Sequence, residues 1–450
     1  MKKDKTLTPD RLRGLLEDRG ASPQDLERFD EVTSRRKFFS QLGKGGAALA
    51  VLGGFGAGTE AAMQGLFGRG MLPVAMASGG EEVTDEQAKR VVADKPGINL
   101  YAQRPINAEF DAHEMGDAVT PYAKHFVRNN DLVPEEAFAK NLQGWSLTID
   151  GEVHNELKLS LDDLKRMKTK KVVAPIECGG NGRAFFDPPV RGNQWKHGAI
   201  GASEWTGVPL RDILRQAGLK NSAVYTGHYG YEPILGDRPR FSRGIPMDKA
   251  MEEHTIVAFQ MNGEDIPAVH GWPVRLVVPG WYGSASHKWL NRIWIRDREH
   301  DGRGMTGFSY RMPKYPVRPG ERPPEEDMVV GGPWPIKSMI TSPAPDNTVR
   351  AGQSVKVRGH AWAGEDRVTK VEISTDFGLT WRAAKVSRPA NKYAWVQFEQ
   401  DVRLPNRGYY EIWARAHDHR GNMQPIVQPW NPRGYEGNLV HRVPVEVQPA

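Results

Sequence analysis

The sequence predicts an α+β domain followed by a β-sandwich of immunoglobulin type. Between about residues 141 and 325, short strand-like runs alternate with short amphipathic helical stretches. From about residue 335 onward, short alternating strands follow one another, separated by turn signals such as Asp376-Phe377-Gly378. A proline-rich linker at 318–335 lies between the two patterns.

Four short segments carry the α+β pattern of the first domain. SLTIDGEV is typical of a hairpin with Asp150 and Gly151 at its turn. SLDDLKRM predicts a helix with Ser160 as its N-cap and Asp163 near the capping-box position, and PLRDILRQAGL predicts a second helix that ends at Gly218. VRLVVPG is typical of a buried strand. The proline-rich stretch from about residue 80 to 140 is expected to be irregular.

Four further segments predict the strands of the sandwich. They are QSVKVRGHAW, VTKVEISTD, YAWVQFEQDV and GYYEIWARAHD. The disulfide of antibody domains cannot form within this chain, because the sequence contains one cysteine.

Length and composition favour packed globular domains. A chain of 450 residues with 39% hydrophobic residues is too long for a single core. We assign 1–77 to a signal region and linker, 78–325 to the α+β domain, and 326–450 to the sandwich. The net charge of +6 is not gathered in a long basic block, which argues against nucleic-acid binding. There is also no P-loop and no G-x-G-x-x-G motif after a strand.

The N-terminal region carries a twin-arginine export pattern. Arg35 and Arg36, in SRRKFF, precede the weakly apolar run LGKGGAALAVLGGFGAG. Ala75-Met76-Ala77 offers a cleavage site before Ser78. Twin-arginine export carries folded proteins, so we expect a periplasmic protein whose cofactor is inserted before export.

The lone cysteine, Cys178, follows a strand-like segment and precedes a glycine-rich loop in APIECGGNGRAFF. A single thiolate does not suffice for a zinc or iron–sulfur site, and covalent c-type haem needs two cysteines. The residues alone are compatible with three roles for Cys178. Cys178 is an inert residue, a nucleophile, or the sole protein ligand of a soft metal whose other ligands are dithiolene sulfurs of an organic cofactor.

Five ordered motifs resemble those of the sulfite oxidase family of molybdenum enzymes. They are HFVRNN (125–130), ECGGNGR (177–183), HGWPVRLVVPG (270–280), GSASHKWL (283–290) and WNPRGY (430–435). STDFGLTW and RAHDHRGNMQP are similar to the family's C-terminal dimerisation domain. The segments RPINAEF, DAVTPYAKHFVRNN and GNQWKHGAIGASEWTGVPLRDIL are most similar to bacterial periplasmic sulfite dehydrogenases.

The resemblance implies one molybdenum ion, held by one molybdopterin and by the Cys178 sulfur. It also implies an anion pocket lined by Arg128, Arg183, Arg433 and Trp195, since guanidinium groups stay charged and donate in a planar fork. A catalytic tyrosine is expected at Tyr315 in SYRMPKYP, and Tyr310 competes for this role.

Pterin contacts are also carried over from the family. The resemblance places the following residues at the cofactor: Arg128, Asn129, Asn130, His270, Arg275, Ser286, His287 and Lys288. A pterin-contacting aspartate of the vertebrate members has no counterpart in TGHYGYEP, where Tyr229 or Glu232 is expected to substitute for it.

The family implies a sulfite dehydrogenase that oxidises sulfite to sulfate. The sequence has no C-x-x-C-H haem motif, so we expect no haem in this chain and transfer of electrons to a separate c-type cytochrome. A homodimer is expected from the likeness of the sandwich domain. The alternatives are a sulfane dehydrogenase acting on carrier-bound sulfur, a cofactor-free binding module, and a reductase of methionine sulfoxide or similar oxides.

Overall fold

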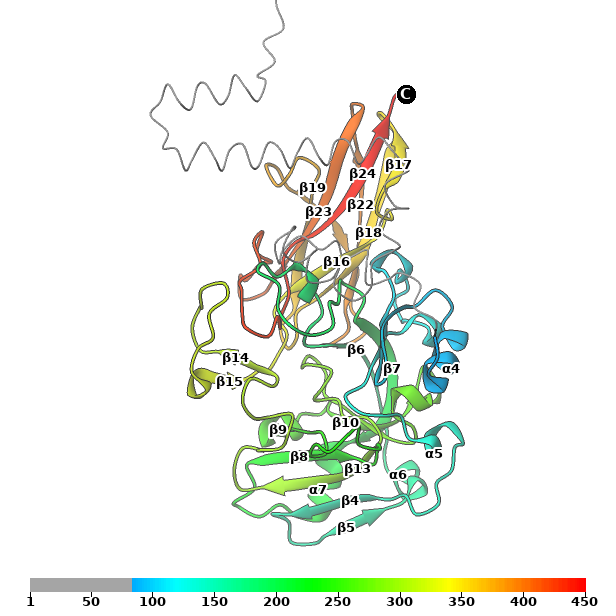
Figure 1. Ribbon diagram of the computed structural model, residues 1–450, viewed down its shortest axis with the longest axis vertical. Coiled ribbons are helices and arrows are strands. Elements are labelled where there is room, and N and C mark those ends of the chain that lie inside the picture. Colours follow the sequence, from blue (N-terminus) through cyan, green and yellow to red (C-terminus); the bar gives the residue numbers. More distant parts are fainter. Residues whose placement is uncertain (1–82) are drawn as a thin grey trace, which may run out of the picture. The chain divides into compact units, whose positions relative to one another are not determined.

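The computed structural model describes residues 83–450 (Figure 1). The twin-arginine motif, the cleavage site before Ser78 and the whole of the predicted signal region lie outside the described residues. The expected α+β domain followed by a β-sandwich is confirmed.

The segment expected to be irregular folds into a helix and a small sheet. Asp85 caps helix α4 (Glu86–Asp94), because its carboxylate accepts hydrogen bonds from the backbone N–H groups of Gln87 and Ala88. Three strands then form a sheet in the order β1-β2-β3. Their bounds are β1 (Asn99–Gln103), β2 (Ile106–Glu109) and β3 (Val127–Arg128). The short helix α5 (Glu135–Phe138) follows.

A five-stranded sheet carries the cysteine loop. Its strands run in the order β11-β10-β7-β6, and β12 also pairs with β10. Their bounds are β6 (Lys170–Glu177), β7 (Ile200–Pro209), β10 (Ile256–Met261), β11 (Glu264–Asp265) and β12 (Arg275–Val277). The buried strand predicted in VRLVVPG is β12. Strand β6 ends at Glu177, so Cys178 is the first residue of the loop that follows.

A second five-stranded sheet has the order β5-β4-β13-β8-β9. Its strands are β4 (Leu147–Gly151), β5 (Leu157–Leu159), β8 (Tyr225–Gly230), β9 (Ser242–Pro246) and β13 (Leu290–Arg296). The hairpin of β4 and β5 is confirmed, but its turn is wider than expected. Gly151 still pairs with Ile295 of β13, so the strand continues through the predicted turn.

Short helices pack beside these sheets. Helix α6 (Leu161–Arg166) begins with the predicted capping box of Ser160 and Asp163, and α7 (Leu210–Ala217) ends at Gly218 with φ of 68°. Helix α8 (Met247–Ala250) follows β9. Residues of α7, such as Ile213 and Leu214, share one buried apolar cluster with Ile149 and Ile293 of the second sheet.

The C-terminal domain is a sandwich of two sheets around an apolar core (Figure 1). One sheet has the order β16-β18-β22-β21, and the other has the order β17-β24-β23-β19-β20. The bounds are β16 (Lys337–Ser342), β17 (Asn347–Arg350), β18 (Ser354–Trp362), β19 (Val368–Ser374), β20 (Arg382–Ala383), β21 (Lys385–Val386), β22 (Val396–Arg403), β23 (Gly408–Asp418) and β24 (His441–Gln448).

The predicted linker contains a strand of its own. Strand β15 (Met328–Val330) pairs antiparallel with β14 (Arg311–Pro313) of the first domain. The first sandwich strand begins only at Lys337. The linker is therefore tied to the first domain as well as to the sandwich.

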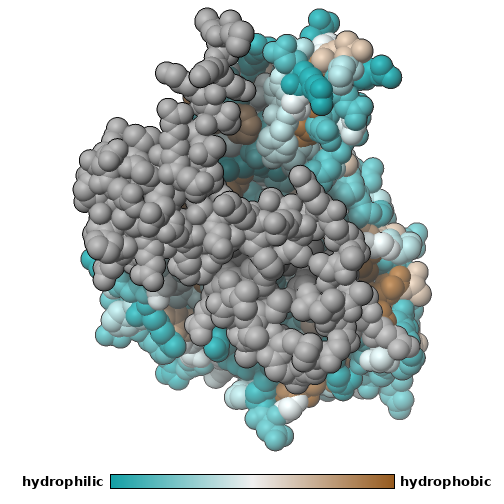
Figure 2. All heavy atoms as spheres, turned by 45° about the horizontal axis from the view of Figure 1, so that its top comes forward, coloured by the Kyte–Doolittle hydropathy of each residue, from teal (hydrophilic) through white to brown (hydrophobic). Residues whose placement is uncertain are grey.

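On the face shown in Figure 2, described residues are mainly hydrophilic, with small separate apolar areas. Within residues 83–450, no helix is long and apolar enough to cross a bilayer.

Buried histidines are expected to make stability depend on pH, and His360 offers a test. Its ring stacks on Trp395 at 3.9 Å between centroids, and Nε2–H donates to the Met115 carbonyl over 2.8 Å. Burial lowers the pKa of His360 to about 4. The unfolded chain therefore binds the proton more tightly, and the stability from a neutral His360 is lost as pH falls from about 6.5 towards 4.

We expect His360→Gln to reduce the loss of unfolding free energy between pH 7 and pH 5 by about 2 kcal/mol. Urea unfolding at both pH values measures this difference. The exposed His113→Gln should leave it unchanged. An equal pH dependence in the wild type and in His360→Gln would contradict the prediction.

Candidate active site

The cysteine loop has glycine at two positions where the local geometry favours it. Cys178 N–H donates to the Ala199 carbonyl over 2.9 Å, and the loop then turns back at Gly182, where φ is 91°. A Cβ on Gly180 would lie 2.2 Å from the guanidinium of Arg183. The glycines expected from the sequence therefore let the loop fold tightly around an arginine.

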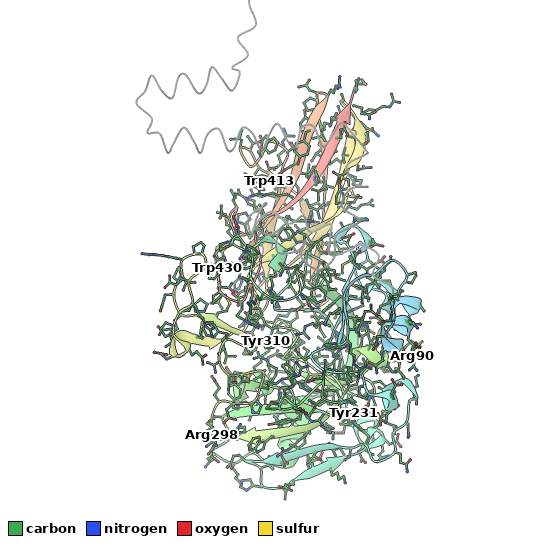
Figure 3. The ribbon with its side chains drawn as sticks, in the orientation of Figure 1. Arg90, Tyr231, Arg298, Tyr310, Trp413 and Trp430 are labelled. Atoms are coloured by element: carbon green, nitrogen blue, oxygen red, sulfur yellow. The ribbon has the colours of Figure 1, made fainter. Side chains whose placement is uncertain are left out.

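Two adjoining cavities meet at Cys178. The inner cavity has a volume of about 80 Å³, and the outer cavity has a volume of about 460 Å³. Both are lined by Cys178, Arg128, Asn130, Phe241 and Tyr310. Figure 3 shows Tyr310 between the sheet that contains β8 and the base of the sandwich.

The structure brings together the predicted site residues except Tyr315 and Tyr229, the latter being one of two candidates for a pterin contact. The inner cavity is also lined by His270, Arg275, Ser286, His287 and Lys288. The outer cavity is also lined by Asn129, Arg183, Trp195 and Arg433. Trp195 is fully buried, with its ring 5.0 Å from that of Tyr101.

The inner cavity presents hydrogen-bonding atoms that have no partner among the described residues. These buried atoms are His125 Nε2, Arg128 Nη1, His270 Nε2, Arg275 Nε and His287 Nδ1. Unpaired polar atoms in a protein interior are costly unless a ligand pairs with them. This set fits a ligand that is rich in hydrogen-bonding groups.

The inner cavity is also electropositive. Among the described residues, Arg275 donates to the carbonyls of His270 and Ser286, each over 2.8 Å, and burial lowers its pKa to about 9. Burial also lowers the pKa of Lys288, whose ammonium donates to the Val269 carbonyl over 2.8 Å. Two buried cations favour an anionic group, and a pterin phosphate fits this description.

An acidic side chain completes the inner cavity. Glu232 lies there with Oε2 unpaired among the described residues, and burial raises the pKa of its carboxyl to about 7. Tyr229 lines a separate surface hollow with Arg240 and Arg292. Of the two candidates for the family's pterin-contacting aspartate, only Glu232 therefore lies in the inner cavity.

Three arginines of the outer cavity, Arg128, Arg183 and Arg433, lack carboxylate partners within the described residues, whereas Arg238 and Arg303 pair with Asp131. Arg128 donates to Asn130 Oδ1 over 2.8 Å and to the Tyr310 hydroxyl over 3.3 Å. Arg183 donates from Nε to the Arg433 carbonyl over 3.0 Å and from Nη1 to the Asn193 carbonyl over 2.9 Å. Their positive charges are left for a small anion beside the thiol.

The structure corrects the expected position of the tyrosine. Tyr315 lies outside both cavities, is 44% exposed, and donates to Asp327 over 2.8 Å. Tyr310 precedes β14 and is the tyrosine whose hydroxyl meets Arg128. Strand β14 separates the two tyrosines, and its pairing with β15 carries Tyr315 away to the surface.

Comparison with known proteins agrees with this geometry. Residues 133–303 match the oxidoreductase molybdopterin binding domain, and residues 332–448 match the Mo-co oxidoreductase dimerisation domain. Chicken sulfite oxidase is 32% identical over 366 residues, which cover 77% of each protein. The sulfite oxidase of Arabidopsis thaliana is 30% identical over 382 residues, which cover 77% of this chain and 93% of the plant protein.

The chain belongs to the sulfite oxidase family. Human mitochondrial sulfite oxidase is 33% identical over 374 residues, and this alignment covers 79% of the present chain but 66% of the human protein. Among solved structures, the sulfane dehydrogenase SoxCD from Paracoccus pantotrophus superposes with a TM-score of 0.64 at 28% identity. That match covers 76% of this chain and 84% of the SoxCD chain.

Several residues of this sulfite oxidase family site were not predicted. Tyr435 stacks on Tyr310, with ring centroids 5.6 Å apart and 6° between the planes. Arg243 is fully buried with its guanidinium 5.0 Å from the centre of the Tyr310 ring. Tyr435 lies in the WNPRGY motif, so its place near the site could have been found, whereas no sequence signal marks Arg243.

We expect Lys288→Met to lose the pterin while the chain still folds. Removing a buried cation from the inner cavity removes a charge-assisted contact, so bound pterin should fall at least about tenfold. Fluorescence of the oxidised, released pterin measures its amount. The surface variant Lys140→Met, which replaces a lysine paired with Asp265, should retain it. Full pterin content in Lys288→Met would contradict this assignment.

Proposed function

We propose that the chain is a molybdenum-dependent sulfite dehydrogenase that oxidises sulfite to sulfate. One observation carries the proposal: a lone thiol adjoins arginines that have no carboxylate partner among the described residues. No group of three or more histidine, cysteine or acidic residues within residues 83–450 could hold a metal. A metal at Cys178 would therefore take its other ligands from the cofactor.

The chain's own residues then have distinct tasks. Cys178 would ligate the molybdenum, and the residues around the inner cavity would hold the pterin. When bound, the molybdenum centre supplies the oxygen atom that sulfite gains and accepts its two electrons. Arg128, Arg183 and Arg433 bind the sulfite dianion. At 4 Å, a pair of opposite unit charges gains about 4 kcal/mol at an effective dielectric constant of 20.

Tyr310 orients the bound anion and holds a proton close to it. Its hydroxyl lies 3.3 Å from Arg128 Nη2, so the cation and the phenol face the same space. Trp195 closes one wall of the outer cavity and limits access of water. The pocket therefore favours a small oxyanion that accepts several hydrogen bonds.

Electron transfer, location and assembly belong to the same proposal. Electrons pass to a separate c-type cytochrome; the sequence has no C-x-x-C-H motif that would attach a c-type haem to this chain. The protein is exported to the periplasm by the twin-arginine route, as the motif at Arg35 and Arg36 suggests. It forms a homodimer through the domain that matches the dimerisation family.

A sulfane dehydrogenase is the second candidate. The structural similarity to SoxCD and the outer cavity of about 460 Å³ favour it, because a carrier-bound sulfur needs more room than free sulfite. A cofactor-free binding module would contain no metal, and a sulfoxide reductase would not need an arginine-lined pocket. Turnover of free sulfite separates the first two candidates.

We expect one molybdenum per chain and steady-state oxidation of free sulfite with ferricyanide and with cytochrome c. Elemental analysis and spectrophotometry measure both. Cys178→Ser should abolish turnover, because the metal loses its protein ligand. Absence of molybdenum, or full activity in Cys178→Ser, would defeat the proposal. Oxidation of carrier-bound sulfur alone would favour the second candidate.

We expect Tyr310→Phe to lower kcat/KM for sulfite by about 10- to 100-fold, the worth of one hydrogen bond involving a charged partner. Tyr315→Phe provides the matched control and should match the wild type, since its hydroxyl contacts Asp327 at the surface. Steady-state kinetics at several sulfite concentrations decide the matter. A loss in Tyr315→Phe and not in Tyr310→Phe would reverse the assignment.

A further inference from the structure

The carboxylate that precedes the cysteine is buried in a cluster with two residues of the sandwich. Glu177 Oε1 accepts from Lys337 Nζ over 2.7 Å, and Oε2 accepts from Trp362 Nε1 over 2.7 Å. Lys337 begins β16, and Trp362 ends β18. The side chains of Glu177 and Lys337 are each 2% exposed.

The same cluster extends into the cysteine loop. Asn181 Nδ2 donates to Glu177 Oε1 over 2.8 Å, and Lys337 Nζ also donates to the Asn181 carbonyl over 3.3 Å. Asn181 N–H in turn donates to the Cys178 carbonyl over 2.8 Å. Glu177, which precedes the 178–181 turn, and Asn181, which ends it, are therefore both held by the Lys337 ammonium of the other domain.

Folding stability alone does not account for this arrangement. A buried ion pair contributes little net stability, because desolvation of two charges offsets their attraction. Here the carboxylate receives three directional donors, and two of them come from a different domain. Directional hydrogen bonds to a single group fix its position more narrowly than apolar packing does.

We propose that Glu177, Lys337 and Trp362 form a latch through which the sandwich domain positions the Cys178 sulfur for metal ligation. They are positioning residues, and this role rests on the proposed function of Cys178 as a metal ligand. A second backbone contact supports the same loop, since Glu436 N–H donates to the Gly179 carbonyl over 3.1 Å. The dimerisation domain thus sets the geometry of the site as well as assembling the protein.

A double variant tests the latch in the full-length protein. Glu177→Gln with Lys337→Met removes both charges together, so neither is left buried without its partner, and the amide oxygen still accepts a hydrogen bond. The matched control is Lys249→Met with Glu365→Gln. That pair also joins the two domains, over 2.7 Å, with Lys249 on α8. The other described hydrogen bonds of its two charged groups run to Pro279, Trp281 and Tyr393, and not to residues 177–183.

Hydrogen exchange of the peptide that contains residues 178–183 is the first readout. The absorption band from charge transfer between the Cys178 sulfur and the metal is the second. We expect loop exchange at least about tenfold faster in Glu177→Gln/Lys337→Met, because loss of the latch raises the open population. The charge-transfer band should shift, the unfolding temperature should stay near that of the wild type, and the control should leave both readouts unchanged.

Loop exchange equal to that of the wild type would overturn the latch, and so would equal acceleration in the control. If the double variant does not accumulate, Trp362→Phe removes one donor and keeps the ring, and about fivefold faster exchange is expected. Unchanged exchange in Trp362→Phe would also overturn the latch. Loop exchange is measured without substrate. It therefore tests the latch separately from the proposed function, which metal analysis and sulfite turnover of the wild type test.

Discussion

Burial of positive charge without matching carboxylates is the constraint on which the site depends. Arg275, Arg183 and Lys288 are shielded from water, yet their described hydrogen bonds run chiefly to carbonyl and amide oxygens. Such an arrangement is expensive for a folded chain unless anions enter it. Each of the two cavities suits a different anion. The inner one suits a phosphate-bearing pterin, and the outer one suits a small oxyanion beside Cys178.

The site is made by both domains, and neither is sufficient for it. The first domain supplies the cysteine loop and the inner cavity. The second domain supplies Arg433, whose carbonyl accepts from Arg183, and Tyr435, which stacks on Tyr310. Residues 332–448 match the dimerisation domain family. The contacts of Arg433 and Tyr435 show that this domain also forms part of the pocket.

Ordered motifs allowed most of the site to be predicted, because each one fixes several residues on one short piece of backbone. The capping box at Ser160 and the helix end at Gly218 were predictable for the same local reason. Tyr315 was misplaced because two tyrosines lie five positions apart, and only the pairing of β14 with β15 decides which one faces inward. Arg243 and the partners of Glu177 reach the site through contacts between residues that are far apart in the sequence. No local motif therefore predicts these contacts.

Cys178 carries the only thiol in the sequence, and this affects how the protein responds to oxidation. Oxidation by peroxide yields a sulfenic acid, which cells normally rescue through a neighbouring thiol. These 450 residues contain no second cysteine that could trap the sulfenic acid as an intrachain disulfide, so it stays open to further oxidation to the sulfinic acid, which is irreversible. A metal bound to Cys178 would block this oxidation, so chains without the metal would be inactivated by oxidation faster than chains that hold it.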